Sequence, residues 1–184
     1  MKILQLFQSE DQLVRACQQG DAKAQRRIYE KYSAKMLGIC YRYLHDDFEA
    51  EEAMIEGFIK VFSKIESFKL EGSFEGWIRR IMVNEALMAI RSKKQMGWQS
   101  NYEEILYEPS PEMPATNLEN QDLLNLIEKL PLGYKTIFNL YAIEGYAHAE
   151  IAEKLGITES TSKSQLSRAR ELLRKNIELV ETGV

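Results

Sequence analysis

The sequence contains no apolar run of about 18 residues, the length that a membrane-spanning helix needs. The short apolar stretch near its N-terminus is interrupted by Gln5 and is too brief for the apolar region of a signal peptide. We therefore expect a cytoplasmic protein that does not insert into a membrane by itself.

Cysteine and histidine are also scarce, with two residues of each among 184. Cys17 and Cys40 fall where a helix would place apolar side chains, which favours buried, reduced thiols over a disulfide. His45 and His148 lie far apart in sequence, so we expect no metal site. No pairing of nucleophile and base and no glycine-rich phosphate loop is present, which argues against an enzyme and predicts a protein without a cofactor.

The charges are strongly segregated, although the net charge is only −4. Residues 77–94 and residues 160–176 each hold five Lys or Arg against one Glu. Residues 46–56 and residues 98–122 each hold six Asp or Glu and no base. Two basic segments of this kind are compatible with nucleic acid as a partner, despite the acidic average.

Apolar residues recur at spacings of three and four along most of the chain, and alternation of apolar and polar residues is lacking, which predicts an all-α fold. The helical pattern covers residues 1–96, stops in residues 97–117 and resumes in residues 118–184. Three of the four prolines fall in the interruption, which indicates a flexible acidic linker between two small helical domains.

The predicted helices have defined starts and apolar stripes. Their capping residues include Ser9, Asp21 and Ser73. The stripe of the second helix comprises Ala24, Ile28, Tyr32, Met36, Ile39, Cys40 and Tyr43. In the second block, one helix carries Leu123, Leu124, Ile127 and Leu130, and the next carries Ile137, Phe138, Leu140 and Tyr141 and ends at Gly145.

Residues 148–170, HAEIAEKLGITESTSKSQLSRAR, have the pattern of a helix-turn-helix. Ile151 and Leu155 bury one side of a short helix. Gly156 supplies a left-handed turn, and Thr158 caps the following helix. The C-terminal domain is therefore predicted to be a helix-turn-helix.

The second helix of this motif buries only a narrow stripe and leaves a polar face. Lys163, Ser164, Ser167 and Arg168 lie at offsets of one, three and four and share that face. Hydroxyls and bases so placed suit the major groove of DNA. A solvated helix whose charges only confer solubility is the alternative, and the preceding helix, glycine and cap favour DNA because they position the face.

A second basic segment, SFEGWIRRIMVNEALMAIRSKK, occupies residues 73–94. Its apolar residues, Trp77 among them, are expected in the core. Arg80, Asn84 and Arg91 lie on a helix that this core would anchor, so they can face a nucleic acid strand.

Together these motifs resemble the extracytoplasmic-function type of bacterial sigma factor, within the sigma-70 family of RNA polymerase subunits. The resemblance runs from about Ala16 to Lys175. Its carriers, in order, are GDAKAQRRIYEKY, AEEAMIEGFIKVF, SFEGWIRRIMVN, an acidic proline-bearing linker, LPLGYKTIFNLYAIEGYAHAEIAEKLGIT and SKSQLSRAR.

The resemblance implies partners and site residues. The expected partners are core RNA polymerase, promoter DNA and an anti-sigma factor. The helix from residue 50 to residue 62 would dock on the clamp coiled coil of the polymerase through Glu52, Ile55, Glu56 and Ile59. From the residues alone this cluster is a solvated face or, less favoured, a metal site.

The same resemblance assigns DNA contacts to both domains, 1–96 for the minus-ten element and 118–184 for the minus-thirty-five element. The implied minus-ten residues are Asn84, Arg80 and Arg91 with Phe68, Lys69 and Ser73 from a loop that would hold a flipped base. The implied minus-thirty-five residues are Lys163, Ser164, Ser167, Arg168 and Thr161. The linker, residues 97–117, would thread the RNA exit path of the polymerase.

The chain departs from the family pattern in both domains. Ser162 stands where the family usually has an apolar residue, often valine, on the packing side of the recognition helix, and we expect it to cost stability there. Gln165 replaces a common arginine and removes a phosphate contact. In the clamp helix, Ala53, Ile55 and Gly57 replace leucine, glutamine and a longer side chain.

Two other functions are weighed against the sigma factor. A helix-turn-helix regulator independent of core polymerase would explain the second domain and leave the first without a role. A helical protein-binding adaptor would need its basic helices only for solubility, and salt-dependent DNA binding would count against it.

Overall fold

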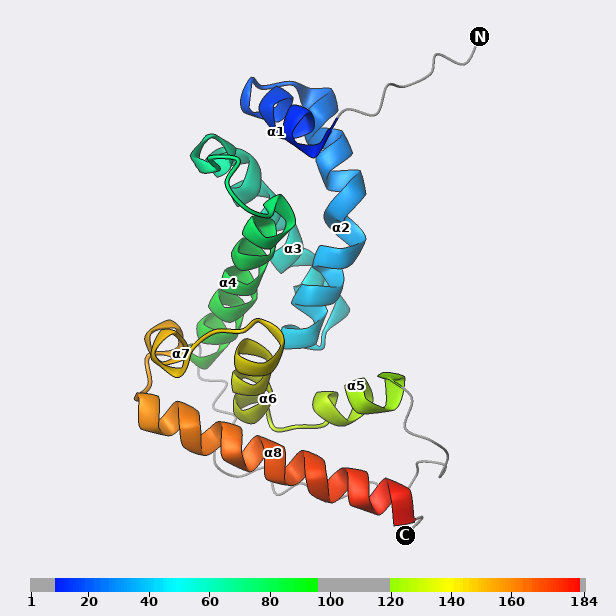
Figure 1. Cartoon of the computed structure of the whole chain (residues 1–184), viewed down its shortest axis with the longest axis vertical. Coiled ribbons are helices and arrows are strands. Elements are labelled where there is room, and N and C mark those ends of the chain that lie inside the picture. Colours follow the sequence, from blue (N-terminus) through cyan, green and yellow to red (C-terminus); the bar gives the residue numbers. More distant parts are fainter. Residues whose placement is uncertain (1–8, 96–119, 183–184) are drawn as a thin grey trace. The chain divides into compact units, whose positions relative to one another are not determined.

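The computed structural model describes residues 9–95 and 120–182, and all regular secondary structure in these two ranges is helical (Figure 1). The prediction of an all-α fold is confirmed. The chain divides into two compact units, Met1–Gln95 and Met96–Val184. The predicted linker, 97–117, lies outside the described residues.

The first unit contains α1 (Glu10–Gln18), α2 (Ala22–Leu44), α3 (Asp47–Lys64), a single 3-10 turn (Ile65–Ser67) and α4 (Phe74–Gln95). Each start has a chemical cause. The Ser9 hydroxyl accepts a hydrogen bond from the Gln12 N–H at 3.3 Å, and the Gln12 amide oxygen accepts one from the Ser9 N–H at 3.0 Å, which completes a capping box. Carboxylates cap the next two helices, Asp21 before α2 and Asp46 before α3.

Helices α2, α3 and α4 pack against one another, and α1 lies against α2. The apolar stripe predicted for α2 is confirmed. All seven of its residues are buried: Ala24, Ile28, Tyr32, Met36, Ile39, Cys40 and Tyr43. Both thiols are free and buried, and desolvation raises the pKa of Cys17 to about 11 and the pKa of Cys40 to about 12. Neither cysteine is therefore a reactive thiolate at neutral pH.

Gly57 of α3 faces Met82 of α4. A Cβ atom at this position would overlap the sulfur and the terminal methyl group of Met82, which is fully buried on α4. The space that Gly57 leaves is thus filled by Met82 from the facing helix.

Replacing Gly57 by alanine should lower the free energy of unfolding. The clashing atoms are the end of the Met82 side chain, but Met82 is fully buried, so we expect a cost of about 2–3 kcal/mol, in the upper part of the usual range for overpacking, against a gain of about 1 kcal/mol in helix propensity. Gly38→Ala is the matched control, because Gly38 is exposed within α2 and a Cβ there meets nothing within 4 Å. Urea denaturation should show Gly57→Ala destabilised and Gly38→Ala stabilised; equal stabilisation of both would contradict the packing described here.

The second unit contains α5 (Asn120–Glu128), α6 (Leu132–Phe138), a π-helical segment η2 (Asn139–Ile143), α7 (His148–Leu155) and α8 (Glu159–Thr182). Part of its predicted core was wrong. Leu123 and Leu124 are exposed, at 41% and 42%. A cluster between α5 and α8 is built instead from Leu126, Ile127, Leu130, Ala169 and Leu173.

The helix predicted to carry Ile137 and Tyr141 and to end at Gly145 changes its period part-way. In η2 the N–H of Glu144 donates to the carbonyl of Asn139 at 2.9 Å, an i to i+5 bond. Such π segments are rare and shift the direction of the side chains that follow. Here the segment carries Tyr141, which contacts His148 of α7.

Lys135 of α6 is buried, with 5% of its surface exposed. Desolvation lowers the pKa of its amine from 10.5 to about 8, with partial compensation from the charge of Glu128. The amine is charged in the unfolded chain up to about pH 10.5. Below pH 8 the folded chain must bury this charge, and as pH rises from 8 to 10.5 that cost is relieved.

We expect Lys135→Met to stabilise the protein at pH 7 by up to about 3 kcal/mol, since one pKa unit corresponds to 1.36 kcal/mol. The native chain should gain stability between pH 8 and pH 10.5 relative to this variant. Lys129→Met, at an exposed lysine of the same unit, is the control. The burial penalty is refuted if Lys135→Met and Lys129→Met show the same stability profile in denaturation at pH 7, 8.5 and 10.

Candidate nucleic-acid interface

Helices α7 and α8 form the predicted helix-turn-helix. Ile151 is fully buried, and Gly156 ends α7 at φ 65°, a left-handed conformation that favours glycine. The N–H of Ile157 donates a hydrogen bond to the carbonyl of Ala152 at 3.1 Å. The Thr158 hydroxyl accepts the N–H of Thr161 at 3.1 Å and so caps α8.

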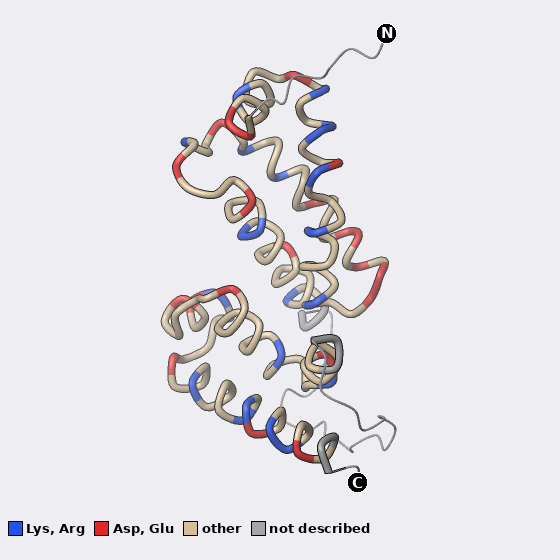
Figure 2. The backbone as a smooth tube through the Cα atoms, turned by 45° about the vertical axis from the view of Figure 1, so that its right-hand side comes forward, with Lys and Arg blue, Asp and Glu red and all other residues tan. Residues whose placement is uncertain are grey.

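Four of the five residues predicted to read DNA are exposed on α8: Lys163, Ser164, Ser167 and Arg168. Lys163 pairs with Glu159 one turn earlier at 2.6 Å, but both side chains are exposed and such a pair contributes little to stability. Figure 2 shows that Lys and Arg recur along α8. The face is therefore available to a partner rather than used in packing.

The hydroxyls of Thr161 and Ser164 already take part in hydrogen bonds at the start of α8. The Thr161 hydroxyl lies 2.8 Å from the Thr158 hydroxyl, and Thr161 is half-buried. The Ser164 hydroxyl donates to the Thr161 carbonyl at 3.0 Å. Both hydroxyl oxygens keep acceptor capacity, because a hydroxyl has two lone pairs.

Ser162 lies on the packing side of α8, as the sequence predicted. It belongs to a buried stripe with Leu166, Ala169 and Leu173, and none of its surface is exposed. The expected cost in stability is offset by a hydrogen bond, since its Oγ lies 2.9 Å from Nδ1 of His148. Gln165, the second departure in this helix, is half-buried.

The predicted minus-ten residues of α4 share one stripe. Arg80, Asn84 and Arg91 are exposed at spacings of four and seven, while Ile78 on the other side is fully buried. Met88 lies in the same stripe, one turn beyond Asn84, and is 52% exposed. Met88 was not among the predicted residues, although its spacing of four from Asn84 places it on the same stripe.

The predicted base-binding loop lies between the 3-10 turn and α4. Lys69 and Ser73 are exposed, whereas the Phe68 ring is buried against Phe74 and Trp77, at centroid distances of 5.1 and 5.5 Å. The loop contains Leu70 at φ 59°, which is unusual for a branched residue. Phe68 thus holds the loop to the core, and the exposed Lys69 and Ser73 lie on its solvent side.

Gln18 of α1 anchors this loop, a role that no local pattern in the sequence indicates. Its side-chain amide donates to the carbonyls of Ile65 and Phe68, at 3.0 and 2.9 Å. Both carbonyls lie some 50 positions further along the chain. The amide therefore ties the start of the loop to the first helix.

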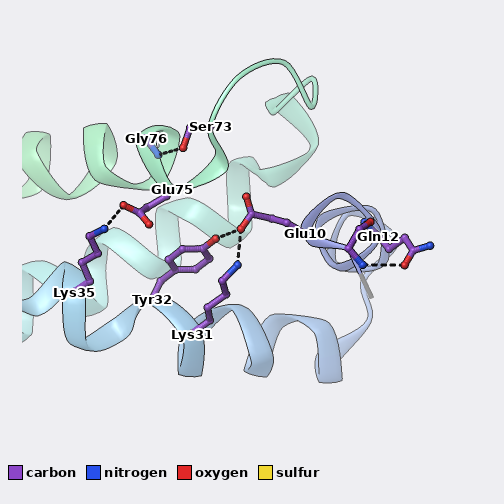
Figure 3. A network of polar contacts seen from close by, with 9 residues as sticks. Glu10, Gln12, Lys31, Tyr32, Lys35, Ser73, Glu75 and Gly76 are labelled. Atoms are coloured by element: carbon purple, nitrogen blue, oxygen red, sulfur yellow. Dashed lines mark hydrogen bonds and ion pairs between the residues drawn. The ribbon is translucent and has the colours of Figure 1, made fainter. Parts of the chain in front are cut away.

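Polar contacts also fix the start of α4 beside α2 (Figure 3). The N–H of Gly76 donates to the Ser73 hydroxyl at 3.1 Å, which confirms Ser73 as the cap. Glu75 forms an ion pair with Lys35 of α2. Each contact holds the segment that leads into the basic face of α4.

A second group of contacts ties α1 to α2 (Figure 3). Glu10 accepts a hydrogen bond from the amine of Lys31 at 2.5 Å and another from the hydroxyl of Tyr32. These two bonds lower the pKa of the Glu10 carboxyl, the bond from Lys31 having the larger effect. They position α1, and with it the Gln18 amide.

The residues predicted to bind polymerase are exposed on α3. Ile55 and Ile59 are 50% and 56% exposed, and Glu52 and Glu56 flank them. Phe48, one turn before Glu52, is 69% exposed and extends the same face. Large apolar side chains left this exposed in a row are typical of a protein-binding surface.

An ion pair between Lys60 and Glu85 connects α3 to α4. The Lys60 amine lies 2.5 Å from a Glu85 carboxylate oxygen, and Glu85 is 8% exposed. The same amine lies 3.8 Å from the Met88 sulfur. This half-buried contact holds the exposed stripe of α4 beside α3.

The described residues contain no cluster of three or more His, Cys, Asp or Glu able to hold a metal ion. Within the same residues, none of the helices is both long enough and apolar enough to cross a membrane.

Comparison with known proteins accounts for both units. Residues 28–96 match the family described as Sigma-70 region 2, and residues 120–173 match Sigma-70, region 4. The chain is 31% identical to the ECF RNA polymerase sigma-E factor of Haemophilus influenzae, over 90% of this chain and 94% of that protein. It is 32% identical to the ECF RNA polymerase sigma factor SigW of Bacillus subtilis, over 89% of this chain and 94% of that protein.

The chain belongs to the extracytoplasmic-function (ECF) family of sigma factors. The fold of this sigma factor is similar to two solved structures. One is RpoE of Bartonella quintana in complex with the anti-sigma factor NepR, with a TM-score of 0.52, 20% identity and coverage of 84% of this chain and 96% of that chain. The other is CnrH in complex with the cytosolic domain of CnrY, with a TM-score of 0.50, 15% identity and coverage of 90% and 95%.

Membership of this family explains why one chain carries two separate basic faces and an exposed acidic and apolar face. A sigma factor must contact both the polymerase and the promoter. Apart from the buried Phe68 and the half-buried Thr161, the predicted residues are exposed on three surfaces that suit these tasks: α3, the loop with α4, and α8.

Proposed function

We propose that this sigma factor divides promoter recognition between its two units. The face of α3 binds core RNA polymerase, the loop and α4 capture the minus-ten strand, and α8 reads the minus-thirty-five element. The observation that carries the proposal is the exposure of four of the five predicted reading residues on a capped helix that the helix-turn-helix holds.

For the upstream element, α8 enters the major groove. Arg168 and Lys163 are suited to guanine O6 and N7, and the hydroxyls of Ser164 and Ser167 can donate or accept. The apolar stripe on the opposite side of α8 holds the helix to the domain, so the reading face needs no rearrangement to bind.

For the downstream element, the stripe of α4 lies along the unpaired strand. Asn84 hydrogen-bonds a base, and Arg80 and Arg91 neutralise phosphates. Met88 contacts a base face, since exposed apolar side chains can insert between base steps. Lys69 and Ser73 border the loop that receives the flipped base.

For polymerase binding, Ile55 and Ile59 supply buried apolar area, and Glu52 and Glu56 supply charge complementarity. Phe48 adds an aromatic side chain at one end of the face, and aromatic residues are frequent hot spots in interfaces. The acidic linker, residues 97–117, is proposed to occupy the RNA exit path.

The proposal includes a regulator of the anti-sigma class, in line with the complex of RpoE with NepR. It places the protein in the cytoplasm, where promoter DNA and polymerase are, and assigns it no catalytic activity or cofactor. A regulator independent of polymerase is less well supported, because it would leave the region 2 unit without a role.

Sequencing RNA 5′ ends after overexpression tests the proposal as a whole. New transcripts should share two upstream elements at a constant spacing. Start sites without shared elements would overturn it.

Arg168→Ala should weaken recognition of the upstream element by about 1–3 kcal/mol, the range for a good base contact. Arg174→Ala, at an exposed arginine further along α8, is the control. Holoenzyme affinity should be measured on promoters with native and scrambled upstream elements. If Arg168→Ala retains full discrimination, Arg168 does not read the element.

A further inference from the structure

Ser162 is a fully buried polar side chain at the start of the packing stripe of α8, and the buried Asn176 lies further along the same stripe. A hydroxyl with no exposed surface needs a hydrogen-bond partner, and Nδ1 of His148 provides it at 2.9 Å. The bond crosses from the recognition helix to α7. It therefore holds the first two turns of α8 at a defined rotation.

The contact continues beyond His148. The His148 ring stacks on Tyr141 of η2, with a centroid distance of 4.6 Å and an interplanar angle of 24°. The guanidinium carbon of Arg170 lies 5.5 Å from the centroid of the same tyrosine ring, in cation-π geometry. The four side chains thus run from α8 to α7, on to η2, and back to α8.

The two ends of this chain of contacts, Ser162 and Arg170, both belong to α8 and lie eight residues apart, about 12 Å along the helix axis. Lys163, Ser167 and Arg168 lie between them. Each residue of an α-helix turns by about 100°, so a small rotation of α8 would move these side chains out of hydrogen-bonding reach of base edges.

We propose that Ser162, His148, Tyr141 and Arg170 act as positioning residues, which set the rotation of the recognition helix and so determine how well it discriminates the upstream element. The inference rests on the proposed function of α8. The contacts among these four side chains depend on direction. They therefore fix the rotation of α8 more precisely than a plain apolar contact would. Ser162 and His148 contribute without touching DNA.

The test uses holoenzyme assembled from core RNA polymerase and the full chain. Its affinity is measured on two duplexes that cover a promoter mapped by RNA 5′ ends, one with the native upstream element and one with that element scrambled. The ratio of the two affinities is the discrimination factor. Measurements are made well below the melting temperature of each variant, so that loss of folded protein does not enter the ratio.

Ser162→Ala and Tyr141→Leu should each lower the discrimination factor by about tenfold, the loss expected for one base contact. Affinity for core polymerase and for the scrambled duplex should stay within about twofold, because phosphate contacts tolerate small rotations. Tyr141→Phe keeps the ring and should behave as the native chain. Ser33→Ala, on α2 of the other unit, is the control for the serine truncation.

Native discrimination in both Ser162→Ala and Tyr141→Leu would overturn the inference and leave the proposed function intact. Equal losses on both duplexes would also overturn it, since they indicate a general structural role. If the native chain itself shows no discrimination, the proposed function of α8 fails, and the inference falls with it.

Discussion

Asn84→Ala should leave binding to core polymerase unchanged and reduce promoter opening by about 5- to 150-fold. The loss corresponds to about 1–3 kcal/mol for a specific base contact. Flipping a base out of the duplex costs a few kcal/mol, so a lost contact to the captured strand acts directly on melting. Asn84 is exposed on a helix anchored by Ile78 and Met82, and its truncation leaves the core intact.

Opening is measured by permanganate reactivity of unpaired thymines at the promoter start site, and polymerase binding by fluorescence anisotropy. Asn125→Ala, the same truncation on α5 of the second unit, should open the promoter normally. Normal opening by Asn84→Ala at its own promoter would remove Asn84 from the minus-ten interface.

The double variant Ile55→Ala, Ile59→Ala should weaken binding to core polymerase by about 2–4 kcal/mol, roughly 30- to 1,000-fold. Both side chains are at least half exposed in the free protein, so their truncation removes apolar area from the complex rather than from the core. Thermal unfolding of the free chain should consequently remain unchanged.

Met88→Ala is the matched control for this variant. Met88 has a similar exposure, 52%, in the same unit, but lies on the stripe of α4 assigned to DNA. It should bind polymerase as the native chain does. Equal effects of the two variants on polymerase binding would contradict the assignment of α3 as the docking face.

Sequence periodicity predicted the parts of this fold that depend on one helix at a time. The prediction for the apolar stripe of α2 was correct at every position, because residues spaced by three and four lie on the same side of one helix and that side faces the core. The capping box at Ser9 and the turn at Gly156 follow from local chemistry in the same way. The exposed face of α8 was predicted for the complementary reason, since it lacks the residues that a core requires.

Contacts between distant segments were not predictable from these patterns. Leu123 and Leu124 have the same spacing as core residues, but α8 covers the neighbouring side of α5, and Leu126 is buried instead. Met82 fills the space above Gly57 from another helix, which a single-helix pattern cannot indicate.

The polar anchors of the site depend on the same kind of long-range contact. Gln18 bonds carbonyls near residue 68, and Ser162 meets His148 across the helix-turn-helix. As single residues, Gln18 is an ordinary surface amide and Ser162 an apparent packing defect. Their structural roles emerge only when the facing element is in place.

Promoter-specific transcription by the reconstituted holoenzyme tests the central claim most directly. Core RNA polymerase is incubated with the purified chain and a template that carries a promoter mapped by RNA 5′ ends. The account predicts a run-off transcript of defined length that requires both the chain and core polymerase and disappears when either promoter element is scrambled. A chain that binds the promoter but neither binds core polymerase nor directs this transcript would contradict the account.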